Sequence, residues 1–118
     1  MSQPVPNIEP GDVDRLLSRD FGAEADTARA ALGALSGNHP GAVARVSAAV
    51  LRLADGDLER LRSAVATALG DWRDVIAAAE YPRYMGLPEG ADATARAAAI
   101  EADGSSYQVW LAGGTPAQ

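Results

Sequence analysis

The sequence predicts an all-α protein, a compact bundle of four to five helices in a single domain. Its 118 residues suffice for one domain. Hydrophobic residues make up 47% of the chain but aromatic residues only 5%. The core must therefore consist mainly of Leu, Val, Ile and Ala, and alanine is the strongest helix former. Apolar residues recur at helical spacing, and no segment alternates strictly between apolar and polar residues, which argues against strands.

The two ends of the chain differ in composition from the middle. Residues 1–9 contain two prolines and show no periodicity, so we expect an extended or disordered tail. Residues 10–112 carry the helical patterns and are predicted to form the helical-bundle domain. Residues 113–118 combine glycine, proline and polar residues, which predicts a second disordered tail.

Two helices are predicted at the start of the domain. Pro10 suits the first turn of a helix that runs to about residue 21, with Asp12 and Asp14 near its positive end. Its apolar residues share one face: Val13, Leu16, Leu17 and Phe21. Gly22 ends it, and a second helix follows over about 24–35. The buried stripe of that helix is Ala28, Ala31, Leu32 and Leu35.

A loop at 36–40 separates the second helix from the third, which begins at Pro40. The apolar stripe of the third helix is Val43, Val46, Val50 and Leu53. Gly56 can adopt the left-handed conformation that follows a helix, and Asp57 can accept a hydrogen bond from the first amides of the next helix. Asp55-Gly56-Asp57 therefore predicts a sharp turn between two helices.

The longest predicted helix covers about 58–79. Its apolar residues keep helical spacing over about six turns, and they are Leu58, Leu61, Val65, Leu69, Trp72, Ile76 and Ala79. Gly70 lies inside this helix, and Pro82 disfavours helical geometry at the preceding residue and so ends it. A loop at 85–90 precedes a last helix that begins near Ala91–Asp92 and ends at Leu111. The run 104–106 (Gly-Ser-Ser) could divide this last helix in two.

Composition limits the classes of function. All ten basic residues are arginine, which is also what an alanine-rich, GC-rich coding sequence favours, and the net charge is −6. A negatively charged chain without a basic cluster is repelled by phosphate, so nucleic-acid binding and attraction to anionic membranes are disfavoured. The chain has no cysteine, no apolar run long enough to span a bilayer and no signal-peptide pattern. We therefore expect a cytoplasmic protein.

The residues that could carry catalysis form no known pattern. His39 is the only histidine, so a metal site with several histidine ligands is excluded, and no nucleophile or orienting group is recognisable beside it. Asp71 and Asp74 stand three residues apart on one helix, where a solvated acidic face is the favoured interpretation. The same holds for Glu101 and Asp103. We predict no enzyme, no cofactor and no metal.

A binding function is predicted from the aromatic and charged end of the long helix. Tyrosine and arginine are enriched in binding hot spots, and this end holds Glu80, Tyr81, Arg83 and Tyr84. They indicate a protein-interaction module whose partner is another protein or a second copy of the chain. The competing interpretation is structural: a core role is favoured for Trp72 and Trp110, and a core or capping role is also favoured over a binding surface for Tyr81, Arg83 and Tyr84.

An alternative hypothesis places a ligand inside the bundle. A metal or small molecule would bind between the long helix and the last helix. The polar residues available for it are Asp71, Asp74, Glu80 and Tyr107.

Three segments carry a resemblance: 48–61, 71–82, and 100–103 with 107–111. They contain a Gly-Asp-Leu turn, Arg-Asp-Val, Glu-Tyr-Pro and a closing Tyr-Gln-x-Trp-Leu. In these features the chain resembles a group of small uncharacterised bacterial all-helical proteins. The resemblance covers less than half of the chain. It implies no activity, cofactor or site residue.

Overall fold

The computed structural model describes residues 8–35 and 43–113, and this part of the chain is helical almost throughout. The helices are α1 (Pro10–Phe21), α2 (Ala25–Leu32), α3 (Val43–Ala54), α4 (Leu58–Glu80), α5 (Pro82–Met85) and α6 (Ala93–Leu111), and two short 3₁₀ turns, Gly22–Glu24 and Gly33–Leu35, flank α2. No strand occurs in these ranges, which confirms the predicted all-α class. None of the described helices combines the length and apolar character that crossing a bilayer requires.

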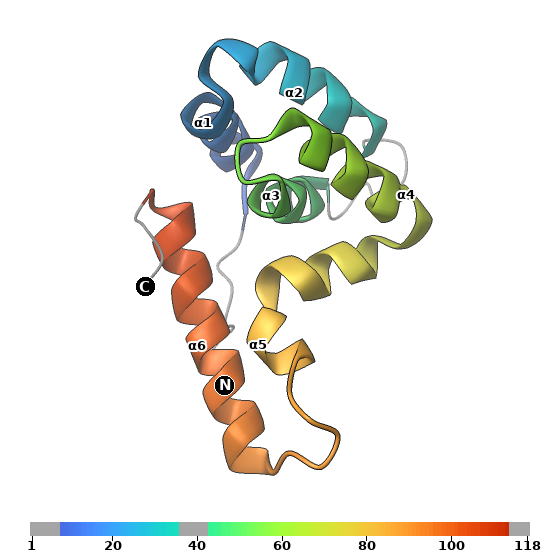
Figure 1. Cartoon of the computed structure of the whole chain (residues 1–118). Helices are drawn as coiled ribbons and strands as arrows, with labels where there is room; N and C mark the ends of the chain where they lie inside the picture. The colour runs from blue at the N-terminus through green and yellow to red at the C-terminus, as the bar shows by residue number, and fades with distance from the viewer. Residues whose placement is uncertain (1–7, 36–42, 114–118) are drawn as a thin grey trace.

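The helices form two regions (Figure 1). The described residues of 8–70 form the N-terminal lobe, in which α1, α2, α3 and the first part of α4 pack together. Residues 72–113 form the arm, which contains the rest of α4, α5 and α6. The arm leads away from the lobe, turns back, and brings the end of α6 beside α1 and α3 (Figure 1). The molecule measures 43 × 30 × 25 Å.

The centre of the N-terminal lobe is α3. It packs along the first part of α4 and against α1, and most of its residues are buried: Val46, Ser47, Ala48, Ala49, Val50, Leu51 and Ala54. Its alanines allow neighbouring helices to approach closely. Ile8 also belongs to this core, although the prediction placed it in a tail outside the domain. Residues 1–7 and 114–118 of the predicted tails lie outside the described ranges.

The turn between α3 and α4 confirms the local prediction. Asp55 and Gly56 both have positive φ angles, 51° and 78°, and the Asp57 side chain accepts a hydrogen bond from the Arg60 amide at 3.0 Å. A Cβ atom at position 56 would lie 3.2 Å from the Asp20 carbonyl oxygen. Gly56 therefore allows this turn to lie against the end of α1.

The prediction of one regular helix over 58–79 is wrong at a single point. Asp71 has φ −153° and ψ 97°, so α4 consists of two helical segments, 58–70 and 72–80, joined at a kink. The kink leaves Leu69 44% exposed, although it belongs to the apolar stripe. The Asp71 carboxylate accepts a hydrogen bond from the Arg73 amide at 3.1 Å, as a residue capping the second segment does. The Gly-Asp pair that marks the start of α4 recurs here and was the available signal.

The last helix is continuous. Asp92 caps it by accepting a hydrogen bond from the Ala95 amide at 2.8 Å, and it runs to Leu111 without interruption at 104–106. Asp103, Gly104 and Tyr107 are buried. Their contacts with the rest of the protein hold the helix together where its local propensity is weak. The short α5 was missed, because Pro82 both ends α4 and occupies the first position of a new helix.

Candidate functional site

Two carboxylates are completely buried where α3, α4, α5 and α6 meet. They are Glu80, at the end of α4, and Asp103, in α6, and both have an exposed fraction of 0%. A buried carboxylate is costly unless it is paired and hydrogen-bonded. Each of these two has an arginine partner.

Glu80 is held by Arg45 of α3 through two parallel hydrogen bonds. Arg45 Nη2 lies 2.7 Å from Glu80 Oε1, and Arg45 Nε lies 2.9 Å from Oε2. This hydrogen-bonded pairing raises the pKa of the Arg45 guanidinium above its usual value. Such fork-to-fork pairing fixes direction as well as distance. The end of α4 is therefore fixed in orientation on α3.

Asp103 caps a helix that is not its own. Its Oδ1 accepts a hydrogen bond from the Arg83 amide at 3.1 Å, and its Oδ2 accepts one from the Tyr84 amide at 3.0 Å. These amides are in the first turn of α5, where the helix supplies no acceptor. Arg83 Nη1 also donates to Asp103 Oδ1 at 3.1 Å and to Ser106 Oγ at 3.0 Å. Asp103 thus fastens α5 rigidly to α6.

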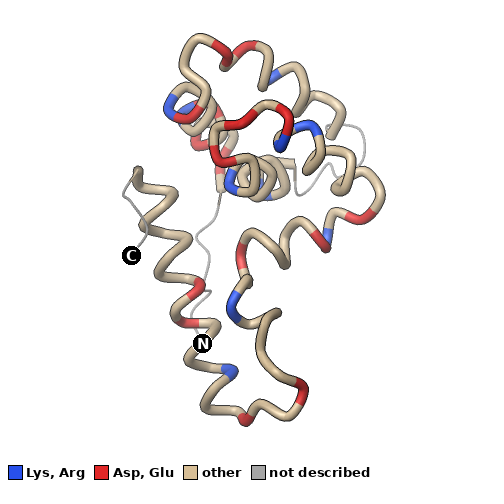
Figure 2. Tube along the Cα trace, in the orientation of Figure 1, with Lys and Arg blue, Asp and Glu red and all other residues tan. Residues whose placement is uncertain are grey.

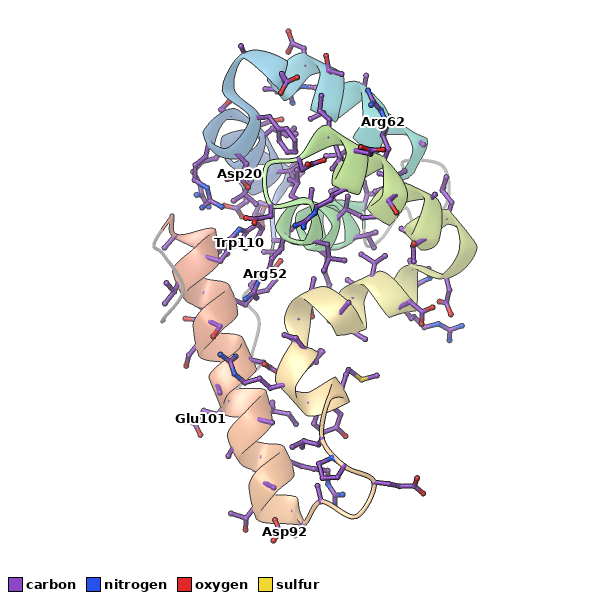
Figure 3. The ribbon with its side chains drawn as sticks, in the orientation of Figure 1. Asp20, Arg52, Arg62, Asp92, Glu101 and Trp110 are labelled. Carbon is purple, nitrogen blue, oxygen red and sulfur yellow. The ribbon has the colours of Figure 1, made fainter. Side chains whose placement is uncertain are left out.

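We call this place, where α3, α4, α5 and α6 meet, the junction. Arg52 of α3 lies in the middle of it and joins the lobe to the arm. Its Nη1 donates to the Ala79 carbonyl at 3.1 Å, and its guanidinium carbon lies 5.2 Å from the centre of the Tyr107 ring and 5.9 Å from that of Trp110. Burial lowers the pKa of Arg52, and the nearby tyrosine opposes this shift. Figure 3 shows Arg52 and Trp110 near each other where α6 approaches the lobe. A cation over two aromatic rings stabilises this contact.

Unlike the carboxylates and guanidinium groups around it, the Tyr107 hydroxyl is buried without a hydrogen-bond partner within the described ranges. The whole residue is completely buried. Burial raises its pKa above the usual value, and the negative charge of Glu80 adds to the shift. Tyr107 is therefore protonated at neutral pH. Its ring packs edge-on against Trp110, with ring centres 5.3 Å apart.

The end of α6 is attached to α1 by one arginine. Arg19 Nη1 donates to the Trp110 carbonyl at 2.5 Å, and its guanidinium carbon lies 5.2 Å from the centre of the Trp110 ring. This carbonyl is in the last turn of α6 and also accepts a hydrogen bond from the Gly113 amide at 3.0 Å. Arg19 is thus a C-terminal cap supplied by the lobe.

The four residues predicted to form a binding surface lie in different environments. Glu80 is buried in the ion pair with Arg45, so it is not available on the surface. Arg83 has a half-exposed side chain that is tied to Asp103, and its role is to position α5. Tyr81 is half-buried, and Tyr84 is 36% exposed. The end of α4 points into the protein at Glu80 because Glu80 pairs with Arg45 of α3. The sequence around Glu80 gives no sign of this distant partner.

The exposed part of α5 is more apolar than predicted. Met85, which the sequence analysis assigned to a loop, is 62% exposed and follows Tyr84 directly. The rings of Tyr81 and Tyr84 meet edge to face at 6.4 Å. Tyr84 and Met85 are two of the four large hydrophobic residues that are exposed in the described ranges, the others being Leu69 and Val109. We call Tyr84 and Met85 the α5 surface.

The residues of the alternative ligand site occupy separate surroundings. Asp71 lies at the kink and pairs with Arg73. Asp74 lines a hollow of about 340 Å³ formed by α3 and both segments of α4, whereas Tyr107 is in the interior beside Arg52. No group of three potential metal ligands occurs among the residues that the structure describes. His39 lies outside them, so the structure says nothing of its role.

Asp103 is the functional group that sequence reasoning missed. It was interpreted with Glu101 as part of a solvated face, yet only Glu101 is exposed, and it is labelled on the outer side of α6 in Figure 3. The available signal was spacing, because Asp103 lies four residues from both Ala99 and Tyr107 and so shares their buried face. An acid on the buried face of a helix requires a partner elsewhere.

Comparison with protein-family models, with curated proteins and with solved structures gave no match. The resemblance to small bacterial helical proteins therefore stays a prediction.

Proposed function

We propose that the protein is a non-enzymatic protein-interaction module that binds a protein partner through the α5 surface. The observation that carries the proposal is that Tyr84 and Met85 are exposed next to each other on a helix whose first amides are capped by Asp103. Aromatic and methionine side chains provide large contact areas and are enriched in protein interfaces.

The support beneath α5 favours binding. A four-residue helix has little stability of its own, but the Asp103 carboxylate fixes its first amides and Arg83 ties it to α6. The α5 surface is thus held in place before any partner arrives, and preorganisation reduces the entropic cost of binding. The net charge of −6 favours a protein over a nucleic acid as the partner.

The charge distribution around α5 agrees with a mainly apolar contact. Figure 2 shows few charged residues along α6 and the connection that leads to it, whereas the lobe carries many. In α6 the charged residues are Arg96, Glu101 and the buried Asp103. Interface cores are depleted in charge relative to the remaining surface.

The test is capture of partners from a lysate of the cells that make the protein. The double variant Tyr84→Ser/Met85→Ser is compared with wild type and with Leu69→Ser, a matched control that removes an exposed apolar side chain from the other region. We expect partners retained by wild type and by Leu69→Ser to be lost with the double variant. Retention of every captured protein by the double variant, or no capture by wild type, would contradict the proposal. Circular dichroism checks that all three proteins are equally helical.

A further inference from the structure

We propose that the chain self-associates by exchanging its arm, residues 72–113, with a second copy, and that Asp71 is the hinge. In the exchanged dimer each lobe binds the arm of the other chain through the contacts described above. This inference goes beyond the proposed function, because the exchange leaves the α5 surface exposed.

The first observation is that the sequence of α4 suits two conformations. In a straight helix its apolar residues, from Leu58 to Ala79, would share one continuous face. In the kinked helix that face is interrupted, and Leu69 is 44% exposed. Straightening at Asp71 would place Trp72, Ile76 and Ala79 in line with the apolar residues of the first segment. One element with two good arrangements is what a conformational switch requires.

The second observation is geometric. At 1.5 Å per residue, α3 is about 18 Å long and the segment 58–70 about 20 Å long. These two pack along each other and are joined by a sharp turn, so they end at about the same level. In a straight α4, residues 72–80 would continue about 14 Å beyond the level at which α3 begins. Glu80 would then be out of reach of Arg45 in its own chain and available to Arg45 of a second copy.

The third observation concerns the contacts that attach the arm, which include the apolar residues Val75, Ile76 and Ala79 in the shared core and three arginines of the lobe. The arginines reach the arm through Arg45 to Glu80, Arg52 to the Ala79 carbonyl, and Arg19 to the Trp110 carbonyl. Each of these contacts can form equally well with the arm of an identical chain, and the resulting dimer is closed by two-fold symmetry. A hollow of about 340 Å³ lies at the inner angle of the kink, and its lining includes Ser63, Thr67 and Asp74 as well as Leu53 and Val75.

The cap at Asp71 stabilises the kinked chain, and this gives the first test. The Asp71 carboxylate caps residues 72–80 only while the helix is broken, and alanine there favours an uninterrupted helix. Asp71→Ala should lower the dissociation constant of the dimer about tenfold, because each dimer contains two hinges. Asp57→Ala is the matched control, since it removes the equivalent cap at the start of α4 and leaves the hinge intact. Multi-angle light scattering over a wide concentration range measures the dissociation constant of the dimer for both variants.

The second test asks whether the dimer is an exchanged one. In Arg45→Glu, residues 45 and 80 are both acidic, and in Glu80→Arg both are basic, so neither variant can form the pair by itself. An exchanged heterodimer would restore an ion pair at both junctions. We therefore expect native mass spectrometry of the two variants, unfolded and refolded together, to show the heterodimer in large excess over either homodimer. This holds even if each variant alone fails to fold.

Two results would overturn the inference. One is an Asp71→Ala protein that stays as monomeric as the Asp57→Ala control at every concentration. The other is a refolded mixture of Arg45→Glu and Glu80→Arg without an excess of heterodimer. Tyr84→Ser/Met85→Ser should dimerise as wild type does, so failure of the α5 surface to bind a partner and failure of arm exchange give different results.

Discussion

The N-terminal lobe and the arm are held in place by different interactions. The lobe is centred on α3, and its largest fully buried side chains are aliphatic: Leu16, Leu17, Leu35, Leu51, Leu61, Val46 and Val50. The arm shares part of this core through Val75, Ile76 and Ala79, and it also meets the lobe through a polar and aromatic set, Glu80, Arg52, Tyr107 and Trp110. Apolar packing is strong and tolerates many arrangements, whereas a buried ion pair adds little net stability but is costly to break. The lobe thus provides stability, and the junction specifies where the arm goes.

The largest effect is expected from removing the arginine that pairs with Glu80. Arg45→Ala leaves the completely buried Glu80 carboxylate without its partner. Loss of one member of a buried pair costs about 3–5 kcal/mol, because the other charge stays in the interior. Urea denaturation followed by circular dichroism measures the free energy of unfolding.

Two matched variants sharpen this prediction. Glu80→Ala should cost less than Arg45→Ala, because the half-exposed Arg45 side chain remains hydrated. Arg62→Ala removes an exposed arginine and should change stability by less than about 0.5 kcal/mol. If Arg45→Ala is no more destabilising than Arg62→Ala, the ion pair does not hold the arm.

A smaller effect confined to the arm is expected from Asp103→Asn. The amide side chain keeps the size of Asp103 but loses its charge, which two backbone amides and the Arg83 guanidinium contact. Hydrogen bonds to charged groups contribute about 1.5–3 kcal/mol. The measurement is urea denaturation followed by Trp110 fluorescence in a Trp72→Phe background. The matched variant Glu101→Gln, exposed on the same helix, should leave the transition unchanged. Equal effects of the two substitutions would refute the capping role of Asp103.

Tyr107→Phe is expected to stabilise the protein by about 1 kcal/mol, because it removes a buried hydroxyl that has no partner among the described residues. The effect depends on pH. The folded protein raises the pKa of Tyr107, so native Tyr107 stays protonated, and wild-type stability is lost as the pH rises above the unfolded value of about 10. The advantage of Tyr107→Phe should therefore grow above that pH in urea titrations. If the stability difference between Tyr107→Phe and wild type stays constant or decreases above that pH, the burial of the Tyr107 hydroxyl without a partner among the described residues is contradicted.

The smallest effect tests the kink. Leu69→Ala should change the free energy of unfolding by less than about 0.5 kcal/mol, because Leu69 is 44% exposed. Leu61→Ala, two steps away in the same apolar stripe but completely buried, should cost about 2–5 kcal/mol. Comparable losses at the two positions would mean that Leu69 is as buried as Leu61, which contradicts the exposure of Leu69 beside the kink.

The contrast between the two regions also explains what the sequence could predict. The lobe depends on local signals: Pro10 at the start of α1, and the Asp55-Gly56-Asp57 turn, whose capping hydrogen bond is present. The arm depends on contacts between distant residues. Asp103 accepts hydrogen bonds from amides about twenty positions earlier in the chain. Glu80 is buried because it pairs with Arg45, which is 35 positions away. Helical spacing carries no information on such partners.

The kink shows how two local signals can compete. Apolar periodicity continues through Asp71 and predicts a straight helix, while Gly70-Asp71 favours a break with a cap. The structure has the break, and with it Glu80 reaches Arg45 and Val75 and Ile76 join the core. For the candidate site, the aromatic residues near α5 were identified from the sequence. The burial of Glu80 and the exposure of Met85 were not, because both depend on how α5 is placed against α6.

The most direct test of the central claim is native-state hydrogen exchange measured by NMR at increasing, low concentrations of urea. If the arm opens separately from the lobe, the amides of Arg83 and Tyr84 should exchange through an opening of lower free energy and weaker urea dependence than those of Leu51 and Leu61. Arg45→Ala should lower the opening free energy of the arm further, and the difference in opening free energy between arm and lobe should increase. A single opening free energy and a single urea dependence for all four amides would contradict the separation of the molecule into a packed lobe and an arm oriented by its ion pairs.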